Sequence, residues 1–445
     1  MLNPTNIKIQ IVTRHNPLPM EDGTGNYVWG IASYLKEKGF IVQIVWVKAE
    51  GWLIKRGFWL IPRRFARQVD LHIIGEVALG RLRVFPKIWW LPLKAKALNF
   101  IKIILKAIGV FRFMQALRGI KEEKNFSEIA KEIPWDSVPT KEEKLFFQKK
   151  FKHFNPDIIL AIFYWMCPLW DGLEHKGALL RICLAQDIMH MRKDPLVTKS
   201  AAENLILTTK EQEKKCLSSA DVIAVVSEDG REFFHSIFPE KEVILVSNGV
   251  EVFSQKSPPV AGRCLFVSGF QQYNVQGLRW FLSEIWPKII QKQPEAELHV
   301  CGNVCKFFES ENYPNVKFLG RLETLENEYK EAQVVVIPVL FGTGLSIRLT
   351  ETFSFGKACV TTTVGIRGLK FACSAVICSD KPDEFAESVI RLLKDSNLRM
   401  AYEEKSKAFA REYLSKERCY QPLIDVINKH IRLSNCRGGA TIKTV

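Results

Sequence analysis

The most constraining feature of this chain is that both of its halves open with the same local patterns: a short apolar strand, a glycine-bearing turn and an amphipathic helix. In the first half, the strand is IKIQIVT (residues 7–13), Gly23 and Gly25 lie in a loop after it, and a helical stretch follows. In the second half, the strand is RCLFVSG (263–269). A strand, a helix and a second strand in this order predict a parallel sheet. We therefore expect an α/β chain with two similar domains.

The length and the spacing of the apolar runs indicate where these domains meet. A chain of 445 residues is longer than one ordinary core accommodates. The polar, proline-bearing run SQKSPPVAG interrupts the strand pattern. We therefore predict five successive parts, namely a first domain (1–253), a linker (254–262), a second domain (263–415), a closing helix (416–433) and a disordered tail (434–445).

The predicted elements are strand-sized β-branched runs and amphipathic helical stretches. The expected strands of the first domain are 7–13, 41–47, 157–163, 181–185, 220–227 and 242–250. Those of the second domain are 263–269, 296–302, 316–320, 334–339, 358–362 and 375–379. Helices are expected at about 275–290, 345–355, 382–394, 397–413 and 416–432.

The stretch from Pro338 to Leu369 carries the most chemical information. A strand ends there, a loop with Gly342 and Gly344 follows, and a helix begins. Glycines allow close approach of the backbone to a ligand, and free N–H groups at a helix start attract phosphate. Arg348 lies one turn into the helix, and its guanidinium group is always charged and can donate two parallel hydrogen bonds to a phosphate. Glu351 lies three residues further, and its carboxylate can accept hydrogen bonds from two neighbouring hydroxyl groups of a ribose. A solvated surface charge is the alternative for both side chains.

This region resembles the retaining glycosyltransferases of family 4, the "group 1" family. The resemblance rests on a glycine-rich loop, a basic residue, Glu, Gly, Val, Thr and a later Gly in order. The matching residues are Gly342, Gly344, Arg348, Glu351, Gly356, Val360, Thr361 and Gly365. SADVIAVVSEDGREFF and the stretch around NVQGLRWF resemble the family at the end of its first domain and the start of its second. The resemblance implies the GT-B fold, in which two Rossmann-like domains face each other across a cleft.

The resemblance also implies roles for individual residues. A nucleotide-sugar donor is expected at Gly342, Thr343, Gly344 and Leu345, with the ribose at Glu351 and the base near Arg321. Gly23 and Gly25 are expected in a loop that closes over the donor phosphate and the acceptor; a flexible turn is the alternative. Arg348 is expected to stabilise the leaving diphosphate. Asp187 and His190 are expected to position the acceptor; a helix cap and a surface histidine are the alternatives.

Four departures from the family pattern concern charge. Thr343 stands where many members have a first Glu, and Ser346 stands where a related subgroup has Arg. Gln271, Gln272 and Asn274 occupy the region where many members have Arg and Lys. Gln186 replaces the usual His before Asp187, and His190, one turn later, is the candidate to substitute for it. These departures leave Arg348 as the main predicted phosphate cation.

The chemistry predicted from this pattern needs no metal and no resident cofactor. No Asp-x-Asp pair stands at a strand end, where it could hold a metal bound to a diphosphate. The eleven cysteines show no zinc-site spacing and are expected to be reduced and mostly buried. Leaving-group charge must then be stabilised by helix amides and Arg348. The resemblance implies retention of anomeric configuration.

The positive charge of the chain is concentrated in one segment. The net charge is +15, and residues 46–121 contain sixteen Lys and Arg against three acidic residues, a difference of +13. The segment also contains many large aliphatic and aromatic residues, and 94–111 has a lysine stripe at helical spacing. We predict a basic amphipathic insertion that docks on an anionic membrane surface, where it meets a sugar or lipid-linked acceptor. A helix packed on its own domain is the alternative.

These patterns predict a cytoplasmic enzyme that is peripheral on the inner face of the membrane, with no signal peptide at the start of the chain. The predicted function is sugar transfer in the assembly of cell-surface polysaccharide or glycolipid. The main alternative is a non-catalytic, membrane-associated subunit that binds a nucleotide sugar. An epimerase or phosphorylase on this fold and a nucleic-acid binder fit less well, and no nucleic acid is expected as a partner. The identities of the sugar, the base and the acceptor stay open.

Overall fold

The computed structural model describes most of the chain. The described residues are 6–18, 23–48, 58–66, 69–85, 136–175, 177–191, 208–253, 258–269, 271–322, 324–342 and 344–439. Eleven residues within them are cysteines without a disulfide, and most of these are buried. No described helix has both the length and the apolar character needed to cross a membrane.

The first domain is built on a seven-stranded parallel sheet with strand order β10-β9-β8-β7-β1-β2-β4. Its strands are β1 (Lys8–Thr13), β2 (Ile41–Trp46), β4 (Asp70–Ile73), β7 (Ile158–Ile162), β8 (Leu180–Ala185), β9 (Val222–Val225) and β10 (Glu242–Leu245). The helices around it are α1 (Gly23–Glu37), α3 (Arg63–Ala66), α7 (Lys141–Phe154), η2 (Tyr164–Leu169), η3 (Met189–Met191), α8 (Lys210–Ser218) and α9 (Glu228–Ile237).

The central strands of this sheet are buried on both faces, as parallel strands covered by helices usually are. All five residues of β7 are buried, which explains its continuous apolar sequence IILAI. β1 pairs with β7 on one side and β2 on the other. The carboxyl ends of β1, β7 and β8 therefore lie next to one another at one edge of the sheet, where α/β proteins commonly bind ligands.

The second domain is built on a six-stranded parallel sheet with strand order β13-β12-β11-β14-β15-β16. Its strands are β11 (Arg263–Val267), β12 (Glu297–Cys301), β13 (Val316–Gly320), β14 (Val334–Ile337), β15 (Ala358–Thr361) and β16 (Ile377–Cys378). Its helices are α10 (Gln272–Trp280), η5 (Phe281–Ile285), α11 (Trp286–Lys292), η6 (Asn303–Phe307), α12 (Glu326–Glu331), α13 (Ile347–Ser354), η7 (Val364–Ile366), η8 (Lys370–Ser374), α14 (Pro382–Lys394) and α15 (Ser396–Tyr413). The prediction of two Rossmann-like α/β domains is confirmed.

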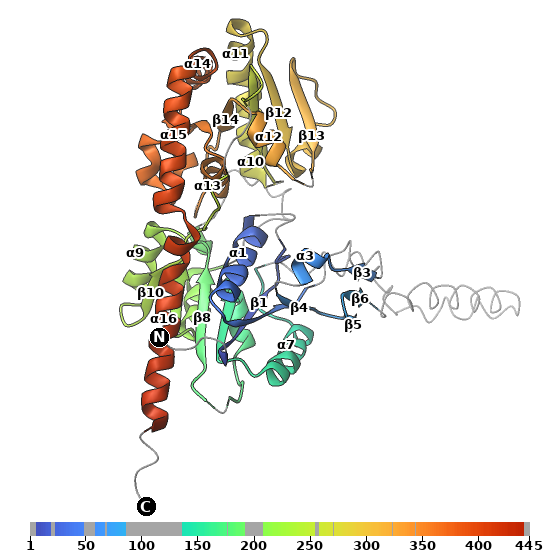
Figure 1. Cartoon of the computed structure of the whole chain (residues 1–445), viewed down its shortest axis with the longest axis vertical. Coiled ribbons are helices and arrows are strands. Elements are labelled where there is room, and N and C mark those ends of the chain that lie inside the picture. Colours follow the sequence, from blue (N-terminus) through green and yellow to red (C-terminus); the bar gives the residue numbers. More distant parts are fainter. Residues whose placement is uncertain are drawn as a thin grey trace, which may run out of the picture.

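One helix returns from the second domain to the first. Figure 1 shows α15 beside the upper domain and α16 (Lys416–Gly439) beside the lower one. α16 packs against α1 and β10 of the first domain, so the chain crosses between the domains twice. The expected end of this helix at 433 is too early, since the helix continues to Gly439. The residues from Ser434 include no strong helix breaker before the glycine pair at the end, and the remaining residues of the predicted tail lie outside the described part.

Two other helix boundaries differ from expectation. Gly23 and Gly25 were expected in a loop, but both lie in the first turn of α1. The two glycines suggested a loop because of their low helix propensity, which tertiary contacts override here. The second-domain helix expected from Val275 begins earlier, as α10, and runs through a π-helical turn (η5) into α11.

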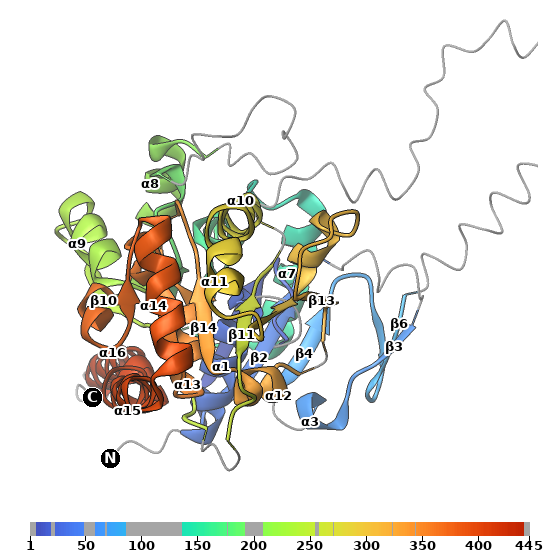
Figure 2. The same cartoon turned by 90° about the horizontal axis from the view of Figure 1, so that it is seen from above.

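The basic segment contains more regular structure than the sequence indicated. The predicted insertion at 46–121 begins with the last residue of β2 and includes β4, which is an edge strand of the main sheet. β4 was missed because its sequence, DLHI, is short and half polar. A separate antiparallel sheet follows, with order β3-β6-β5, formed by β3 (Phe58–Leu60), β5 (Val77–Leu79) and β6 (Leu82–Val84). Figure 2 places β3 and β6 at one side of the molecule, away from α16. The predicted helix at 94–111 lies outside the described residues.

Candidate functional site

The glycine loop joins the carboxyl end of β14 to the start of α13, as predicted. Gly342 and Gly344 have φ values of 145° and 71°, which favour glycine. A Cβ atom at Gly344 would lie 3.1 Å from Cγ of Asp187, which belongs to the first domain. Two predicted site residues from different domains therefore meet here. Thr343 lies outside the described residues, and the Leu345 side chain is buried.

Arg348 and Glu351 lie one turn apart on α13, half-buried at the junction of the two domains. Nη1 of Arg348 donates a hydrogen bond to Oγ of Ser268, at 3.1 Å, directly after β11. The carboxylate of Glu351 accepts long hydrogen bonds from Nδ2 of Asn26, at 3.4 Å, and from Oη of Tyr329, at 3.3 Å. Asn26 belongs to α1 of the first domain, so Glu351 contacts both domains.

Burial changes the acid–base properties of both α13 side chains. Burial raises the pKa of Glu351 to about 7, although the Tyr329 hydroxyl and the nearby Arg348 oppose this change. Burial also lowers the pKa of Arg348 from its ordinary value, and the guanidinium keeps its charge. A carboxyl group with a pKa near 7 beside an arginine is the kind of perturbed pair that is common at functional sites.

The start of α1 packs closely against the second domain and against its own preceding loop. A Cβ atom at Gly23 would lie 2.9 Å from Cγ1 of Ile347, the first residue of α13. A Cβ atom at Gly25 would lie 2.4 Å from the carbonyl oxygen of Leu18. These distances leave no room for a side chain at Gly25. Both glycines thus lie at the predicted site, but within a packed helix terminus.

The end of β8 places its polar residues in two different surroundings. Gln186 accepts a hydrogen bond from the Thr24 hydroxyl at 3.3 Å, which joins the end of β8 to α1. Asp187 follows it and accepts a hydrogen bond from the backbone N–H of Ile188. His190 instead has Nδ1 2.6 Å from a carboxylate oxygen of Glu213 on α8, and its ring packs against Phe233 on α9. The structure therefore brings Asp187, but not His190, into contact with the glycine loop among the contacts of the described residues.

Sequence reasoning missed an aromatic cluster at the ends of β1 and β7. Phe163 directly follows β7 and has φ 66° and ψ 152°, a strained conformation for a residue with a side chain. Its ring stacks on Trp165 at 4.3 Å, and the His15 ring lies 5.2 Å away. Strained residues of this kind often mark functional sites. Their torsion angles cannot be inferred from the residue type, so no sequence signal identifies Phe163.

Arg321 lies further from the glycine loop, because it follows a strand at the outer side of the second sheet. It is exposed and directly follows β13, the edge strand of the second sheet. Because the sheet is parallel, the end of β13 lies along the same edge as the glycine loop. Its predicted contact with the nucleotide base stays a prediction.

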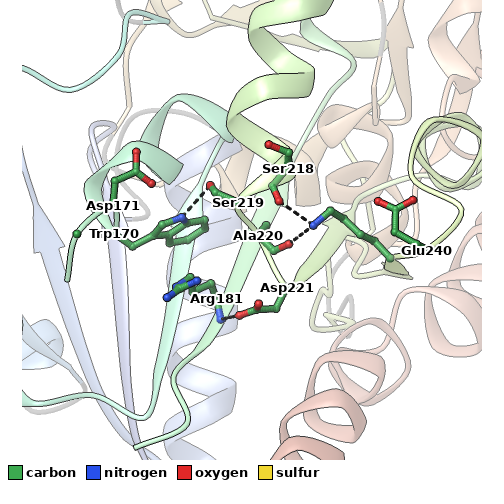
Figure 3. Close-up of a pocket in the computed structure, with 10 residues that line it drawn as sticks. Trp170, Asp171, Arg181, Ser218, Ser219, Ala220, Asp221 and Glu240 are labelled. Atoms are coloured by element: carbon green, nitrogen blue, oxygen red, sulfur yellow. Dashed lines mark hydrogen bonds between the residues drawn. The ribbon is translucent and has the colours of Figure 1, made fainter. Parts of the chain in front are cut away.

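A hollow of about 610 Å³ lies at the opposite edge of the first sheet. It is formed at the amino ends of β8, β9 and β10, and Figure 3 shows Trp170, Arg181 and three acidic side chains around it. The carboxylates belong to Asp171, Asp221 and Glu240. They outnumber the basic lining residues Arg181 and Lys241, which leaves the hollow with a net negative charge, so we do not assign the donor diphosphate to it. Within the described ranges, no cluster of His, Cys, Asp and Glu has the arrangement of a metal site.

Comparisons with known proteins agree with this geometry. Residues 261–395 match the family of glycosyl transferases group 1. This range contains the glycine loop, Arg348 and Glu351. A search among curated proteins finds no match.

Solved structures of similar fold cover nearly the whole chain. A mutant of TarM from S. aureus, in complex with fondaparinux, alpha-GlcNAc-glycerol and UDP, has 12% identity and a TM-score of 0.65, covering 95% of this chain and 100% of that one. Sucrose-phosphate synthase from Thermosynechococcus elongatus has 13% identity and a TM-score of 0.64, covering 96% and 100%. WaaG, a glycosyltransferase involved in lipopolysaccharide biosynthesis, has 15% identity and a TM-score of 0.54, covering 94% and 99%. The fold is that of GT-B glycosyltransferases, and the family match supports an enzyme of this class.

Proposed function

We propose that this chain is a retaining, metal-independent glycosyltransferase of family 4, which moves a sugar from a nucleoside diphosphate to an acceptor. The observation that carries the proposal is the placement of Arg348 and Glu351 on α13, beside a glycine loop, where Glu351 also contacts Asn26 of the opposite domain. A permanent cation and a ribose-binding carboxylate one turn apart are suited to hold a nucleoside diphosphate. The solved structures of similar fold include enzymes of different kinds, so they do not identify the sugar, the base or the acceptor.

The reaction places negative charge on the departing diphosphate. The bond between the anomeric carbon and the diphosphate oxygen breaks, and the start of α13 and Arg348 stabilise the resulting charge. The acceptor oxygen then bonds to the anomeric carbon on the same face, and its proton passes to the diphosphate. Asp187, beside Gly344, lies where it can position the acceptor.

A thermal-shift screen tests the proposal directly. UDP, GDP, ADP and their sugars are each added to the full chain. A ligand at one hundred times its Kd stabilises the folded state by about 2.7 kcal/mol. We expect one base to stabilise clearly more than the others. An absence of stabilisation by every nucleotide contradicts the proposal, and binding without transfer to any acceptor favours a non-catalytic subunit.

We further propose that the enzyme is peripheral on the cytoplasmic face of an anionic membrane and acts there on a lipid-linked acceptor in polysaccharide or glycolipid assembly. The three-stranded sheet supports this. Cross-strand pairing puts six apolar side chains on one face, in the rows Phe58–Val84–Val77 and Leu60–Leu82–Leu79. Four of them are about half exposed or more: Phe58 56%, Leu60 54%, Val77 47% and Leu79 63%.

The partner proposed for this face is lipid because of the surrounding charge. The face lies within the segment that carries the +13 excess. Basic residues are attracted to anionic lipid, at about 1 kcal/mol each near the surface, while the apolar side chains enter the interface. A basic protein partner would be repelled, and an acidic one would not explain the apolar face.

Liposome co-sedimentation tests the membrane proposal. We expect binding to vesicles with anionic lipid and not to neutral vesicles, with salt weakening it. A variant with Leu60→Ser and Leu79→Ser is expected to bind less, as is one with Lys102→Glu and Lys106→Glu. Met400→Ser, a similarly exposed apolar residue on α15, is the control. Equal recovery of the wild type in the supernatant with both vesicle types refutes the membrane proposal.

A further inference from the structure

The glycine loop has a basic neighbour that the sequence pattern did not indicate. Arg367 belongs to the turn after η7 and is half-buried. A Cβ atom at Gly342 would lie 3.3 Å from Nε and 3.4 Å from Cζ of Arg367. The guanidinium therefore lies directly against the glycine loop that we assign to the donor diphosphate.

The backbone around Arg367 is also joined to the start of α13. The Arg367 carbonyl oxygen accepts a hydrogen bond from the N–H of Ser346, at 3.2 Å. A Cβ atom at the next residue, Gly368, would lie 2.9 Å from Cα of Leu345. The turn that carries Arg367 is thus packed on the loop, so its position relative to α13 is set by several contacts.

An aromatic side chain orients the guanidinium. Cζ of Arg367 lies 5.8 Å from the centre of the Tyr273 ring, a cation–π distance, and Nη1 donates a long hydrogen bond to the carbonyl oxygen of Val364. Tyr273 comes from the first turn of α10 and is close enough to Arg348 to influence its pKa. The Tyr273 ring thus helps to hold the Arg367 guanidinium beside the loop.

A buried hydroxyl at the same place has no protein partner. Ser346 is the N-cap of α13, is 1% exposed, and its Oγ has no hydrogen-bond partner within the described part of the chain. A buried hydroxyl without a partner is unfavourable, because it gives up its hydrogen bonds to water and gains none in return. A bound phosphate oxygen would satisfy it, which gives a second and independent indication of an anionic ligand at this point.

We propose that Arg367 is a second cation that binds the donor diphosphate, together with Arg348 and the Ser346 hydroxyl. This inference rests on the proposed function and adds to it. It answers the shortage of positive charge in the sequence pattern. Ser346 stands where a related subgroup has Arg, and Gln271 and Gln272 lie in the region where many members of the family have Arg and Lys. The charge comes instead from the turn after β15, which is distant from those positions along the chain.

Calorimetric titration with inorganic pyrophosphate tests this, because pyrophosphate carries the two phosphates without a base or a sugar. The nucleoside diphosphate selected by the thermal-shift screen and its parent nucleoside are titrated in parallel. We expect Arg367→Gln to weaken pyrophosphate and nucleoside diphosphate binding about 10- to 100-fold, as for a lost hydrogen bond between charged groups. Nucleoside binding is expected to stay the same, and the salt dependence of pyrophosphate binding to become shallower.

Two further variants distinguish the loss of the Arg367 charge from a disturbance of the folded structure. Arg367→Lys keeps the positive charge but loses the planar guanidinium group, and it is expected to retain more affinity for pyrophosphate than Arg367→Gln. Arg391→Gln, an exposed arginine on α14, is the matched control. Equal losses for the Lys and Gln variants, or an equal loss of nucleoside binding, would assign Arg367 a structural role and overturn the proposal.

The failure of this inference is distinguishable from that of the proposed function. Unchanged pyrophosphate binding in Arg367→Gln, with reduced binding in Arg348→Gln, overturns the role of Arg367 and leaves the glycosyltransferase proposal intact. A wild-type protein that binds neither pyrophosphate nor any nucleotide overturns both.

Discussion

The two sides of the domain junction are assembled in different ways. On the second-domain side, the glycine loop, Arg348 and Glu351 come from one loop and the helix that directly follows it, between Pro338 and Ser354. On the first-domain side, His15, Phe163 and Asp187 follow the ends of three different strands, and Asn26 comes from α1. A site built from one loop and one helix keeps its spacing along the chain, whereas a site built from strand ends depends on the order of strands in the sheet. The first kind can be recognised in a sequence, and the second kind largely cannot.

The charges on the two sides also differ. The second domain presents two guanidinium groups around its loop and a carboxyl group whose pKa is raised to about 7. The first domain presents one carboxylate, Asp187, and close backbone packing at Gly25. We infer a division of work, with donor binding on the second domain and acceptor positioning on the first.

The largest expected effect concerns Arg348. Arg348→Gln removes the charge that we propose stabilises the leaving diphosphate, and we expect the rate of sugar transfer to fall about 10²- to 10³-fold. Initial rates with a radiolabelled nucleotide sugar measure this, with Arg391→Gln as the control. A fall smaller than that caused by any first-domain variant would reverse the proposed division.

Glu351→Gln is expected to affect binding and stability in opposite directions. The loss of the carboxylate should weaken nucleotide binding by about 1.5–3 kcal/mol, as measured by calorimetry. The pKa of Glu351 rises from 4.5 to about 7 on folding, so the folded state holds its proton more tightly and loses stability as pH rises from 4.5 to 7. At pH 8 the ligand-free variant should therefore be more stable than the wild type, by about 1–3 kcal/mol.

The stability gain should vanish near pH 4, where the glutamic acid is protonated in both states. Denaturant unfolding at the two pH values measures this difference. A variant that binds nucleotide as tightly as the wild type would remove Glu351 from the donor site.

Gly25→Ala tests the close packing on the first-domain side. Its Cβ atom would overlap the carbonyl oxygen of Leu18, and we expect a loss of folding stability of about 1–3 kcal/mol. Gly177→Ala is the control, since its Cβ atom would meet nothing closer than 3.4 Å. Thermal unfolding compares the two variants. A stable Gly25→Ala protein with impaired donor binding would instead favour the loop that closes over the donor phosphate, as expected from the resemblance.

A smaller effect is expected for Asp187. Asp187→Asn keeps the size of the side chain and removes its charge, so acceptor positioning should weaken and kcat should fall about tenfold, the equivalent of about 1.4 kcal/mol. Donor affinity should stay the same. Steady-state kinetics with varied acceptor concentration provide the measurement, and Asp171→Asn, in the hollow at the other edge, is the control. A loss of donor affinity would indicate that Asp187 binds the donor and not the acceptor.

No effect is expected from metal removal. If the second-domain side neutralises the diphosphate with arginines, transfer should continue in EDTA at the untreated rate. Loss of activity on chelation, with recovery on addition of manganese or magnesium, would contradict metal-independent transfer.

Much of the fold could be predicted from local patterns. Every strand expected in the two domains corresponds to an observed strand, because buried parallel strands are continuous apolar runs such as IILAI in β7. β4 and the small sheet were missed because their strands are only three or four residues long, and β4 and β6 also carry polar residues. The start of α1 was misplaced because glycine is a poor helix former, and the contacts with Leu18 and Ile347 that favour it there lie outside the local sequence.

The sequence by itself determined the order of the elements, the glycine loop and the spacing of Arg348 and Glu351 on one helical face, because these depend on periodicity and on neighbours along the chain. The tertiary structure alone decided what surrounds them. It placed Asn26 on Glu351, Asp187 beside Gly344 and Arg367 beside Gly342, and it paired His190 with Glu213. Side chains far apart along the chain meet only after the sheets have formed and the domains have packed. The balance of charge at the site is therefore a property of the fold.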